Sequence, residues 1–260
     1  MKFTIFGNPV EHSKSPQMQN AGFKYLNQDA LYDKTHLEDG NDIKNVFLKQ
    51  KLKGANITVP HKEYAFKNAD EIKGIALQIG AVNTDILKDD KVIAYNTDAP
   101  GFMKAIKSFG TIKSALILGA GGTSKAIAVA LKEKNIDVTV LNRSANRLDF
   151  FNDLNCTTYN WDDFVISQYD IVINSTSAGL KDTNLPAPKN IIEDILLHSK
   201  FAFDCIYGKQ TPFLKLAQDC KIPYKDGEDM LLYQGVIAFE LFNGIKADDG
   251  LVEAMRSGLK

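Results

Sequence analysis

Residues 114–147, SALILGAGGTSKAIAVALKEKNIDVTVLNRSANR, contain the pattern that decides the fold. The apolar run at 115–118 has the length and branching of a buried parallel strand. A glycine-rich turn, Gly119-Ala120-Gly121-Gly122, follows it, and residues 126–131 then repeat apolar side chains at helical spacing. A second apolar run at 138–141 completes a strand–helix–strand unit. The stretch therefore predicts a Rossmann-like α/β domain with a parallel, doubly wound sheet.

The glycine-rich turn predicts a dinucleotide site. Gly119 and Gly121 permit a tight turn and let the backbone approach a pyrophosphate, which then lies at the positive end of the following helix. Ser124 stands where the usual fingerprint has a third small residue for helix–strand packing. A tight turn that binds no ligand is the alternative, because a glycine pattern alone is weak evidence.

The end of the second strand indicates which dinucleotide binds. About 20 residues after the turn, the fingerprint expects an acidic residue that takes a ribose 2′-hydroxyl. This chain has Asn142-Arg143-Ser144 there instead. Arg143 and Arg147 would attract a 2′-phosphate, which a carboxylate would repel, so the sequence predicts NADP. Solvated surface cations are the alternative.

The composition is that of an ordinary globular protein with room for two domains. Of its 260 residues, 44% are hydrophobic and 24% charged, and the net charge is −1, which gives no reason to expect nucleic acid or a membrane as a partner. Three widely spaced cysteines form no disulfide framework, and the four histidines lack the spacing of metal ligands. We expect a cytoplasmic monomer or homodimer without a metal ion.

Strands and helices alternate on both sides of the central unit. The first half predicts a mixed α/β unit, with strands at 3–6, 30–37 and 54–59, a helix from Pro16, helices near 43–47 and 71–78, and a hairpin of 81–87 with 91–95. The second half predicts further strands at 156–159, 169–174, 201–204 and 222–224.

The last segments, 229–245 and 248–259, are helical and no strand follows them. We therefore expect the C-terminal helices to pack back on the first domain. This places a substrate domain at 1–98 plus 229–260 and a cofactor domain at 99–228.

Polar side chains gather where strands of the first domain end, which is where open α/β sheets bind ligands. They are Ser13, Ser15, Thr58, Lys62, Asn83, Thr84, Asn96, Thr97 and Asp98. Hydroxyls, amides, one ammonium and one carboxylate suit a small polyhydroxylated molecule. Each residue also has an ordinary structural explanation, since Ser15 and Asp98 are good helix caps and most lysines are solvated. Because all of them are expected at the same end of the sheet, the set as a whole favours a ligand-binding site.

Nine motifs span nearly the whole chain: GNPVEHSKSP, GANITVPHK, GAVNT, NTD, GAGGTSK, NRS, NSTSAGL, DCIYGKQTPFL and DGEDMLLYQG. In this order they are similar to the motifs of shikimate dehydrogenases. The resemblance implies an NADP-dependent enzyme that interconverts shikimate and 3-dehydroshikimate, a step of aromatic amino-acid biosynthesis. It also implies two α/β domains with the active site in the cleft between them.

The resemblance also assigns roles by position. Lys62 would be the catalytic group, and Asp98 would orient both the lysine and the substrate hydroxyl. Ser13 and Ser15, assisted by Tyr207, would hold the substrate carboxylate. The residues that position the ring hydroxyls would be Thr58, Asn83, Asp98 and Gln234. The residues that bind the cofactor would be Gly119, Ala120, Gly121, Gly122, Thr123, Ser124, Asn142, Arg143, Ser144, Arg147, Thr176 and Ser177.

Three positions depart from the family pattern. Gln19 stands where a histidine is common, Ala99-Pro100-Gly101 follows NTD in place of Gly-x-Gly, and Thr123 replaces the commoner alanine. None of them removes a group with an assigned chemical role.

Three rival functions remain at this point. The nearest is a quinate/shikimate dehydrogenase that uses NAD or NADP, although the cations at 143 and 147 argue against NAD. A folate-linked dehydrogenase of similar build would need no serine pair for a cyclohexene carboxylate. A nucleotide-sensing regulator would need the cofactor site alone, so the presence of both Lys62 and Asp98 speaks against it.

Overall fold

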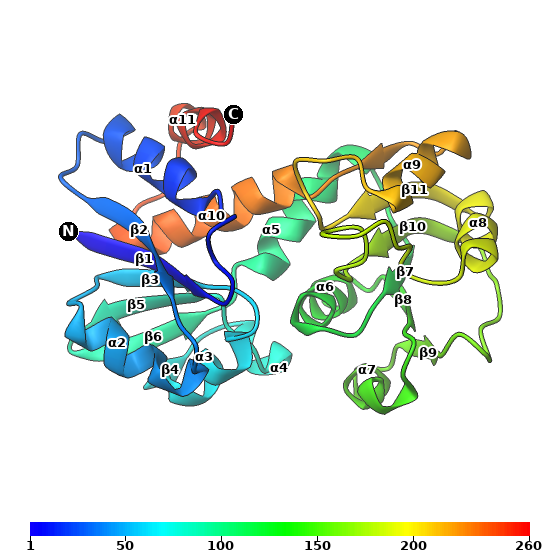
Figure 1. Ribbon diagram of the computed structural model, residues 1–260, viewed down its shortest axis with the longest axis horizontal. Helices are drawn as coiled ribbons and strands as arrows, with labels where there is room; N and C mark the ends of the chain where they lie inside the picture. Colours follow the sequence, from blue (N-terminus) through cyan, green and yellow to red (C-terminus); the bar gives the residue numbers. More distant parts are fainter. The chain divides into compact units, whose positions relative to one another are not determined.

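The computed structural model describes residues 1–260, which divide into two compact units. The first unit comprises 1–101 and 232–260, and the second comprises 102–231. Two helices pass from one unit to the other, α5 (Asp98–Ala105) and α10 (Glu228–Asn243) (Figure 1).

The first unit is built on a mixed six-stranded sheet in the order β2-β1-β3-β5-β6-β4. Its strands are β1 (Lys2–Gly7), β2 (Leu31–His36), β3 (Gly54–Ile57), β4 (Glu71–Ile72), β5 (Thr84–Lys88) and β6 (Lys91–Tyr95). Strand β1 pairs in parallel with β2 and β3, whereas β5 is antiparallel to both β3 and β6. This confirms the mixed α/β unit that the sequence predicts.

Helices cover both faces of this sheet. They are α1 (Ser15–Tyr25), α2 (Ile43–Lys49), α3 (Lys62–Asn68), α4 (Ala76–Ile79), part of α10, and α11 (Asp249–Ser257). Phe47 of α2 and Ala65 of α3 join the core on one face. On the other face, the ring of Phe3 lies 4.9 Å from that of Phe23 in α1 and 5.1 Å from that of Phe242 in α10. The C-terminal helices therefore return to the first domain, as expected (Figure 1).

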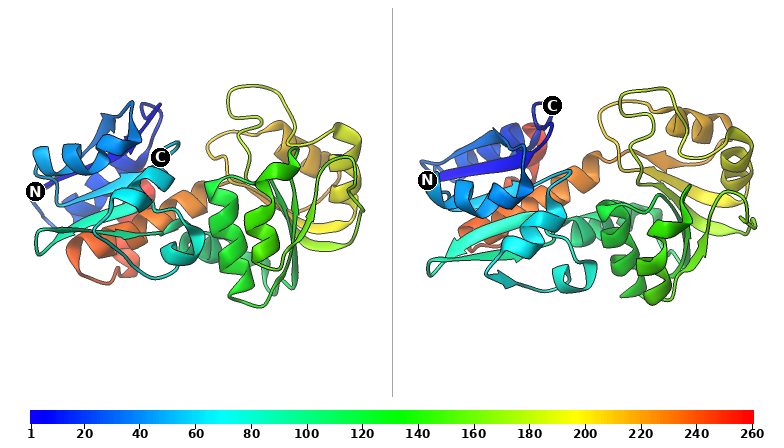
Figure 2. Two further views of the ribbon diagram at one scale, coloured as in Figure 1. Left: turned by 90° about the horizontal axis from the view of Figure 1, so that it is seen from below. Right: turned by 60° about the horizontal axis from the view of Figure 1, so that its bottom comes forward.

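The second unit contains a six-stranded parallel sheet in the order β12-β11-β10-β7-β8-β9. Its strands are β7 (Ser114–Leu118), β8 (Asp137–Leu141), β9 (Thr157–Tyr159), β10 (Tyr169–Asn174), β11 (Ser199–Asp204) and β12 (Tyr224–Lys225). Its helices are α6 (Gly122–Lys132), α7 (Asp149–Asp153), α8 (Lys189–Leu197) and α9 (Pro212–Asp219). Helices α6 and α8 lie on opposite faces of the sheet, so the doubly wound architecture is confirmed (Figures 1 and 2).

Two sequence predictions are wrong in detail. Residues 71–72, expected to begin a helix, form strand β4 instead and pair with β6, where the N–H groups of Asp70 and Lys73 bond to carbonyls of that strand. Gly74, at φ 62°, ends the strand before α4 begins. The last strand is 224–225 rather than 222–224, because Pro223 has no N–H to donate to the ladder.

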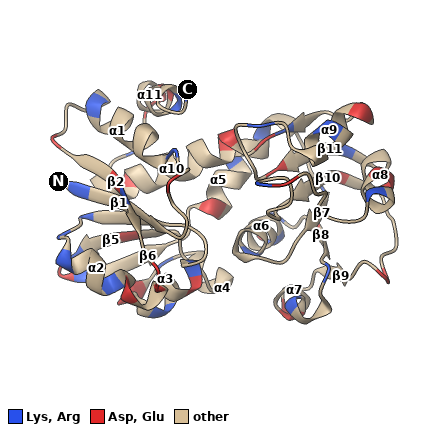
Figure 3. Cartoon of the chain, in the orientation of Figure 1, with Lys and Arg blue, Asp and Glu red and all other residues tan.

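Cations and anions are interspersed over both units (Figure 3). Recognition of an anionic ligand must therefore depend on local groups rather than on one large basic surface. None of the helices is both long and apolar enough to cross a membrane.

Candidate active site

Lys62 and Asp98 are separated by 36 residues in sequence, yet their side chains form an ion pair. Lys62 is the first residue of α3, and Asp98 is the first residue of α5. The Nζ atom of Lys62 donates to Oδ2 of Asp98. The two side chains are only 15% and 9% exposed, so the pair is largely removed from solvent screening.

Asp98 does not cap its own helix. The side-chain oxygen of Asn96 accepts the backbone N–H groups of Asp98 and Ala99, at 3.0 and 3.3 Å. This leaves the Asp98 carboxylate to interact with Lys62 and with other side chains. The capping role of Asn96 was not predicted, although asparagine just before a helix is a recognised signal.

Asn83 lies on the other side of the Asp98 carboxylate. Its Nδ2 donates to Oδ1 of Asp98 at 2.8 Å and lies 3.4 Å from Oε1 of Gln234. Its Oδ1 accepts the backbone N–H of Thr97 at 2.7 Å. Four of the predicted site residues, Lys62, Asn83, Asp98 and Gln234, are thus brought together in the first unit.

Two glycines let Gln234 reach this group. A Cβ on Gly101 of α5 would lie 2.7 Å from the backbone nitrogen of Gln234, and one on Gly235 would lie 2.1 Å from Cε of Met18 in α1. Helix α10 therefore packs closely against both α5 and α1. Gln19 also contributes, because its Nε2 donates to the carbonyl of Gly235 at 3.0 Å. The departure from histidine at this position has a packing explanation.

Ser13, Ser15 and Thr58 follow strands β1 and β3, which are parallel neighbours and end at the same edge of the sheet. Both serines are buried. Ser13 Oγ accepts the N–H of Ser15 at 3.2 Å. The backbone N–H at the start of α1 is therefore hydrogen-bonded by Ser13, and Ser15 does not cap the helix. The alternative role of Ser15 as the helix cap is therefore wrong. The Thr58 N–H donates to Phe6 O at 2.8 Å, which ties the loop after β3 to β1.

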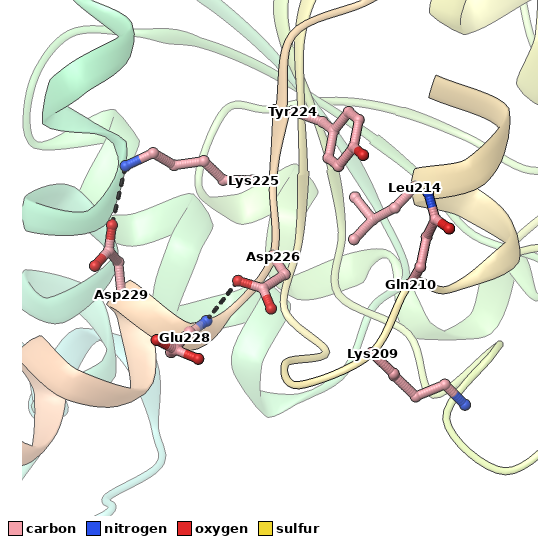
Figure 4. Close-up of a pocket in the computed structure, with 8 residues that line it drawn as sticks. All are labelled: Lys209, Gln210, Leu214, Tyr224, Lys225, Asp226, Glu228 and Asp229. Carbon is pink, nitrogen blue, oxygen red and sulfur yellow. Dashed lines mark hydrogen bonds and ion pairs between the residues drawn. The ribbon is translucent and has the colours of Figure 1, made fainter. Parts of the chain in front are cut away.

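Tyr207 differs from the other predicted substrate residues because it belongs to the second unit, in the loop after β11. Asp226 anchors this loop by accepting the N–H of Gly208 at 3.1 Å, and it also accepts the N–H of Glu228 at the start of α10, at 3.2 Å. Asp226 also lines a pocket of about 450 Å³. The eight lining residues are Lys209, Gln210, Leu214, Tyr224, Lys225, Asp226, Glu228 and Asp229 (Figure 4). None of these eight residues was predicted to bind a ligand.

The glycine-rich turn lies between β7 and α6, at the carboxyl end of the sheet. Gly119 has φ 105°, and a Cβ there would lie 2.8 Å from Cγ2 of Thr176. A Cβ on Gly121 or Gly122 would meet nothing within 4 Å, so the space above this backbone is open. Because β7 is flanked by β8 and β10, the turn lies at the topological switch point, where such sheets bind dinucleotides. The fit to a pyrophosphate is good.

Ser124 stabilises this turn from inside. Its Oγ accepts the N–H of Gly121 at 3.0 Å and lies 2.8 Å from Oγ of Ser175, which in turn donates to Leu118 O. The side chain is fully buried. The hydroxyl thus links the turn after β7 to the loop after β10, in addition to the packing role that the sequence indicates.

The predicted phosphate-binding residues follow β8, the strand next to β7. Arg143 and Arg147 are exposed, while Asn142 Nδ2 donates to Ser144 O at 2.9 Å and closes the loop. Their position at the carboxyl end of the adjacent strand is where a ribose 2′-substituent is bound in this architecture.

Asn174 and Asp204 support the loop that carries Thr176 and Ser177, a role that the sequence did not indicate although both residues belong to the quoted motifs NSTSAGL and DCIYGKQTPFL. Asn174 Oδ1 accepts the N–H and the hydroxyl of Thr176, at 3.0 and 2.8 Å, and its Nδ2 donates to Asp204 at 3.1 Å. Burial raises the pKa of Asp204 to about 6, although a hydrogen bond from Thr211 opposes the shift. Their signal is weak in sequence, because each is a single polar residue at the end of an apolar strand.

Comparison with known proteins connects both units to one family. Residues 5–84 match the shikimate dehydrogenase substrate binding domain, residues 103–185 match shikimate / quinate 5-dehydrogenase, and residues 227–257 match the shikimate 5'-dehydrogenase C-terminal domain. The chain is 44% identical to the shikimate dehydrogenase (NADP(+)) of Helicobacter hepaticus, over 98% of this chain and 95% of that one. The chain belongs to the shikimate dehydrogenase family.

Solved structures of the family have the same fold. The shikimate dehydrogenase of Aquifex aeolicus superposes with a TM-score of 0.89 at 33% identity, covering 98% of this chain and 97% of that one. The enzyme of Thermus thermophilus, solved in complex with NADP(H) and shikimate, gives 0.86 at 32% identity, covering 99% of both chains. The predictions of an NADP-dependent oxidoreductase and of its two-domain α/β fold are confirmed.

Proposed function

We propose that this enzyme interconverts shikimate and 3-dehydroshikimate by a mechanism in which Lys62 and Asp98 handle the proton of the reacting hydroxyl. The observation that carries the proposal is their buried ion pair in the midst of hydroxyl and amide side chains. A secondary alcohol that loses a hydride must also lose its hydroxyl proton, and these two groups are suited to that task.

During reduction the Lys62 ammonium gives a proton to the developing alkoxide and is left as a neutral amine, and during oxidation the neutral amine takes the proton of the hydroxyl. Asp98 orients the ammonium and accepts from the substrate hydroxyl. Acid–base catalysis of this kind contributes about 10²–10⁴-fold to the rate. NADP supplies the hydride chemistry when bound.

Substrate recognition divides between a carboxylate site and a hydroxyl site. Ser13 and Ser15, with Tyr207, donate to the carboxylate of shikimate. The ring hydroxyls are positioned by Thr58, Asn83, Asp98 and Gln234. Paired donors and acceptors of this kind discriminate strongly against analogues that lack a hydroxyl, because a buried polar group would then lose its partner.

For the cofactor, we propose that the backbone of 119–122 binds the pyrophosphate, with Thr123 and Ser124 at the start of α6. Asn142, Arg143, Ser144 and Arg147 bind the adenosine 2′-phosphate, and Thr176 and Ser177 lie against the nicotinamide. Residues 1–98 with 229–260 thus act as the substrate domain, and 99–228 as the NADP domain.

A spectrophotometric assay tests the function. The purified protein is mixed with shikimate and NADP, and formation of NADPH is followed. We expect turnover with this pair, and much weaker turnover when quinate replaces shikimate or NAD replaces NADP. Equal rates with quinate would favour the quinate/shikimate dehydrogenase alternative, and absence of turnover with shikimate would refute the proposal. Sedimentation of the same sample distinguishes a monomer from a homodimer.

A further inference from the structure

A chain of buried hydrogen bonds runs through the first unit and ends at Asp98. The hydroxyl of Tyr32 donates to Asn56 Oδ1 at 2.7 Å. Asn56 Nδ2 donates to Thr84 Oγ1 at 3.0 Å, and Thr84 Oγ1 donates to Asn83 Oδ1 at 3.1 Å. Asn83 Nδ2 then donates to Asp98 Oδ1 at 2.8 Å. The first four residues lie on β2, β3 and β5 and in the loop before β5, and Asp98 is the first residue of α5.

The direction of the bonds that the Asn56 side chain makes is fixed. Asn56 Nδ2 also faces the backbone carbonyl of Asn83, at 3.1 Å, and a carbonyl can only accept. The amide of Asn56 can therefore be turned in one way alone, with its oxygen toward Tyr32. The hydroxyl of Thr84 accepts from Asn56, so its own proton goes to Asn83 Oδ1 at 3.1 Å or to Thr97 Oγ1 at 3.3 Å, and the shorter contact favours Asn83.

The same logic fixes the amide of Asn83. Its Oδ1 receives the Thr84 hydroxyl and also the backbone N–H of Thr97, which can only donate. Its NH₂ group must consequently face the Asp98 carboxylate, where a donor is needed. An amide turned the other way would place an oxygen against a carboxylate oxygen.

We propose that Thr84, Asn56 and Tyr32 are positioning residues for catalysis. They fix the orientation of the Asn83 amide, so that its Nδ2 donates to Asp98 and keeps that carboxylate beside Lys62. This inference rests on the proposed function of Lys62 and Asp98. None of the three positioning residues needs to touch the substrate.

The burial of these groups supports the proposal. Tyr32, Asn56 and Thr84 are 1%, 5% and 0% exposed, and buried polar side chains are costly unless fully hydrogen-bonded. Apolar residues would pack the sheet without this cost. Burial also raises the pKa of Tyr32 well above 10, so its hydroxyl remains a donor throughout the working range of pH.

The test compares two substitutions at Thr84. Thr84→Val keeps the shape and removes the hydroxyl, whereas Thr84→Ser keeps the hydroxyl. The matched control is Thr4→Val, at a buried threonine of β1 whose hydroxyl bonds to Asp33 O and Thr35 but is not part of this chain. For each variant, kcat and the KM for shikimate are measured at saturating NADP, together with the Tm.

We expect kcat of T84V to fall by about tenfold, the effect of roughly one buried hydrogen bond, while KM rises by no more than about threefold. T84S should recover most of the loss, and T4V should lower the Tm without lowering kcat. Equal kcat for T84V and T4V, or no recovery in T84S, overturns the proposal. If T84V does not fold, Tyr32→Phe gives the same comparison.

Crystal structures of T84V and T84S decide the question independently of turnover. The proposal expects Asn83 Nδ2 to leave hydrogen-bond distance of Asp98 in T84V and to keep it in T84S. An unmoved Asn83 in T84V overturns the positioning role whatever the rates are. Wild-type protein that does not oxidise shikimate refutes the proposed function, while these two structures still decide the role of Thr84.

Discussion

Lys62 and Asp98 meet as an ion pair at the first residues of two different helices, α3 and α5. Each helix start is reached directly from the end of a strand or hairpin of the same sheet. The β-sheet therefore fixes the relative position of the ammonium and the carboxylate, and short loops leave little freedom to either. This is the preorganisation that proton transfer to a bound alcohol requires.

Replacement of Lys62 tests the proton-transfer role. Lys62→Ala should lower kcat by two or more orders of magnitude and leave KM for shikimate within a few-fold, because the ammonium acts mainly in the transition state. Steady-state kinetics with shikimate and NADP provide the measurement. Lys67→Ala, at an exposed lysine of the same helix, is the control and should behave as wild type. An unchanged kcat in K62A would remove Lys62 from the chemistry.

Replacement of Arg143 tests cofactor selectivity. Arg143→Ala should raise the KM for NADP far more than that for NAD, since a charge-assisted contact to the 2′-phosphate is worth roughly 1.5–3 kcal/mol. The two constants are compared at saturating shikimate. Lys215→Ala, an exposed cation of α9, serves as the control. Equal effects of R143A on both cofactors would contradict a 2′-phosphate contact.

The two serines test the substrate carboxylate site. The double variant Ser13→Ala/Ser15→Ala should weaken shikimate binding and leave NADP affinity unchanged, because both serines belong to the first unit. Calorimetric titration with each ligand measures this. Loss of the Ser13 hydroxyl also removes the bond to the Ser15 N–H. The free energy of unfolding should therefore fall by about 1 kcal/mol, and the Tm should fall with it. Parallel losses of both affinities would indicate misfolding instead.

Gly101 tests how Gln234 is positioned. Gly101→Ala would place a methyl group 2.7 Å from the backbone nitrogen of Gln234, so α5 and α10 must separate locally. We expect the free energy of unfolding to fall by about 1–3 kcal/mol and the KM for shikimate to rise several-fold. Urea unfolding and steady-state kinetics check the two effects. Wild-type values for both would show that the helices adjust at no cost.

Asp85 should make the stability of the protein decrease with pH. It is completely buried on β5, between Ala55 and Ala94 of the neighbouring strands, and one of its oxygens has no hydrogen-bond partner. Burial raises its pKa from 3.8 to about 8. The folded protein therefore binds a proton that the unfolded chain releases between these two pH values.

The free energy of unfolding should consequently be highest below about pH 4 and fall by roughly 1 kcal/mol per pH unit between pH 5 and 7 through this residue. Asp85→Asn keeps the volume and removes the charge, so it should flatten this part of the curve. Urea unfolding of both proteins from pH 5 to 8 gives the difference. Asp89→Asn, in the exposed hairpin turn, should leave the slope unchanged. If Asp85 were ionised in the folded state, D85N would also leave the slope unchanged, and that result would contradict the prediction.

The sequence by itself determined the features that depend on neighbouring residues. The run from 114 to 147 specifies strand, turn and helix through apolar spacing and glycine, and the confirmed NADP dependence agrees with the cations after β8. Serine, threonine, lysine and asparagine at strand ends were found in the same way, since parallel strands place their carboxyl ends at one edge.

The tertiary structure decided what depends on residues far apart in the chain. Whether Asp98 caps α5 or pairs with Lys62 could not be read from sequence, because Asn96 and Asp98 are both good caps and only the position of α3 distinguishes them. The short strand at 71–72 forms because β6 offers it backbone partners, which overrides the local preference for a helix. The orientation of Asn83 likewise follows from a donor on β5 and another in the loop before α5, and no local pattern records it.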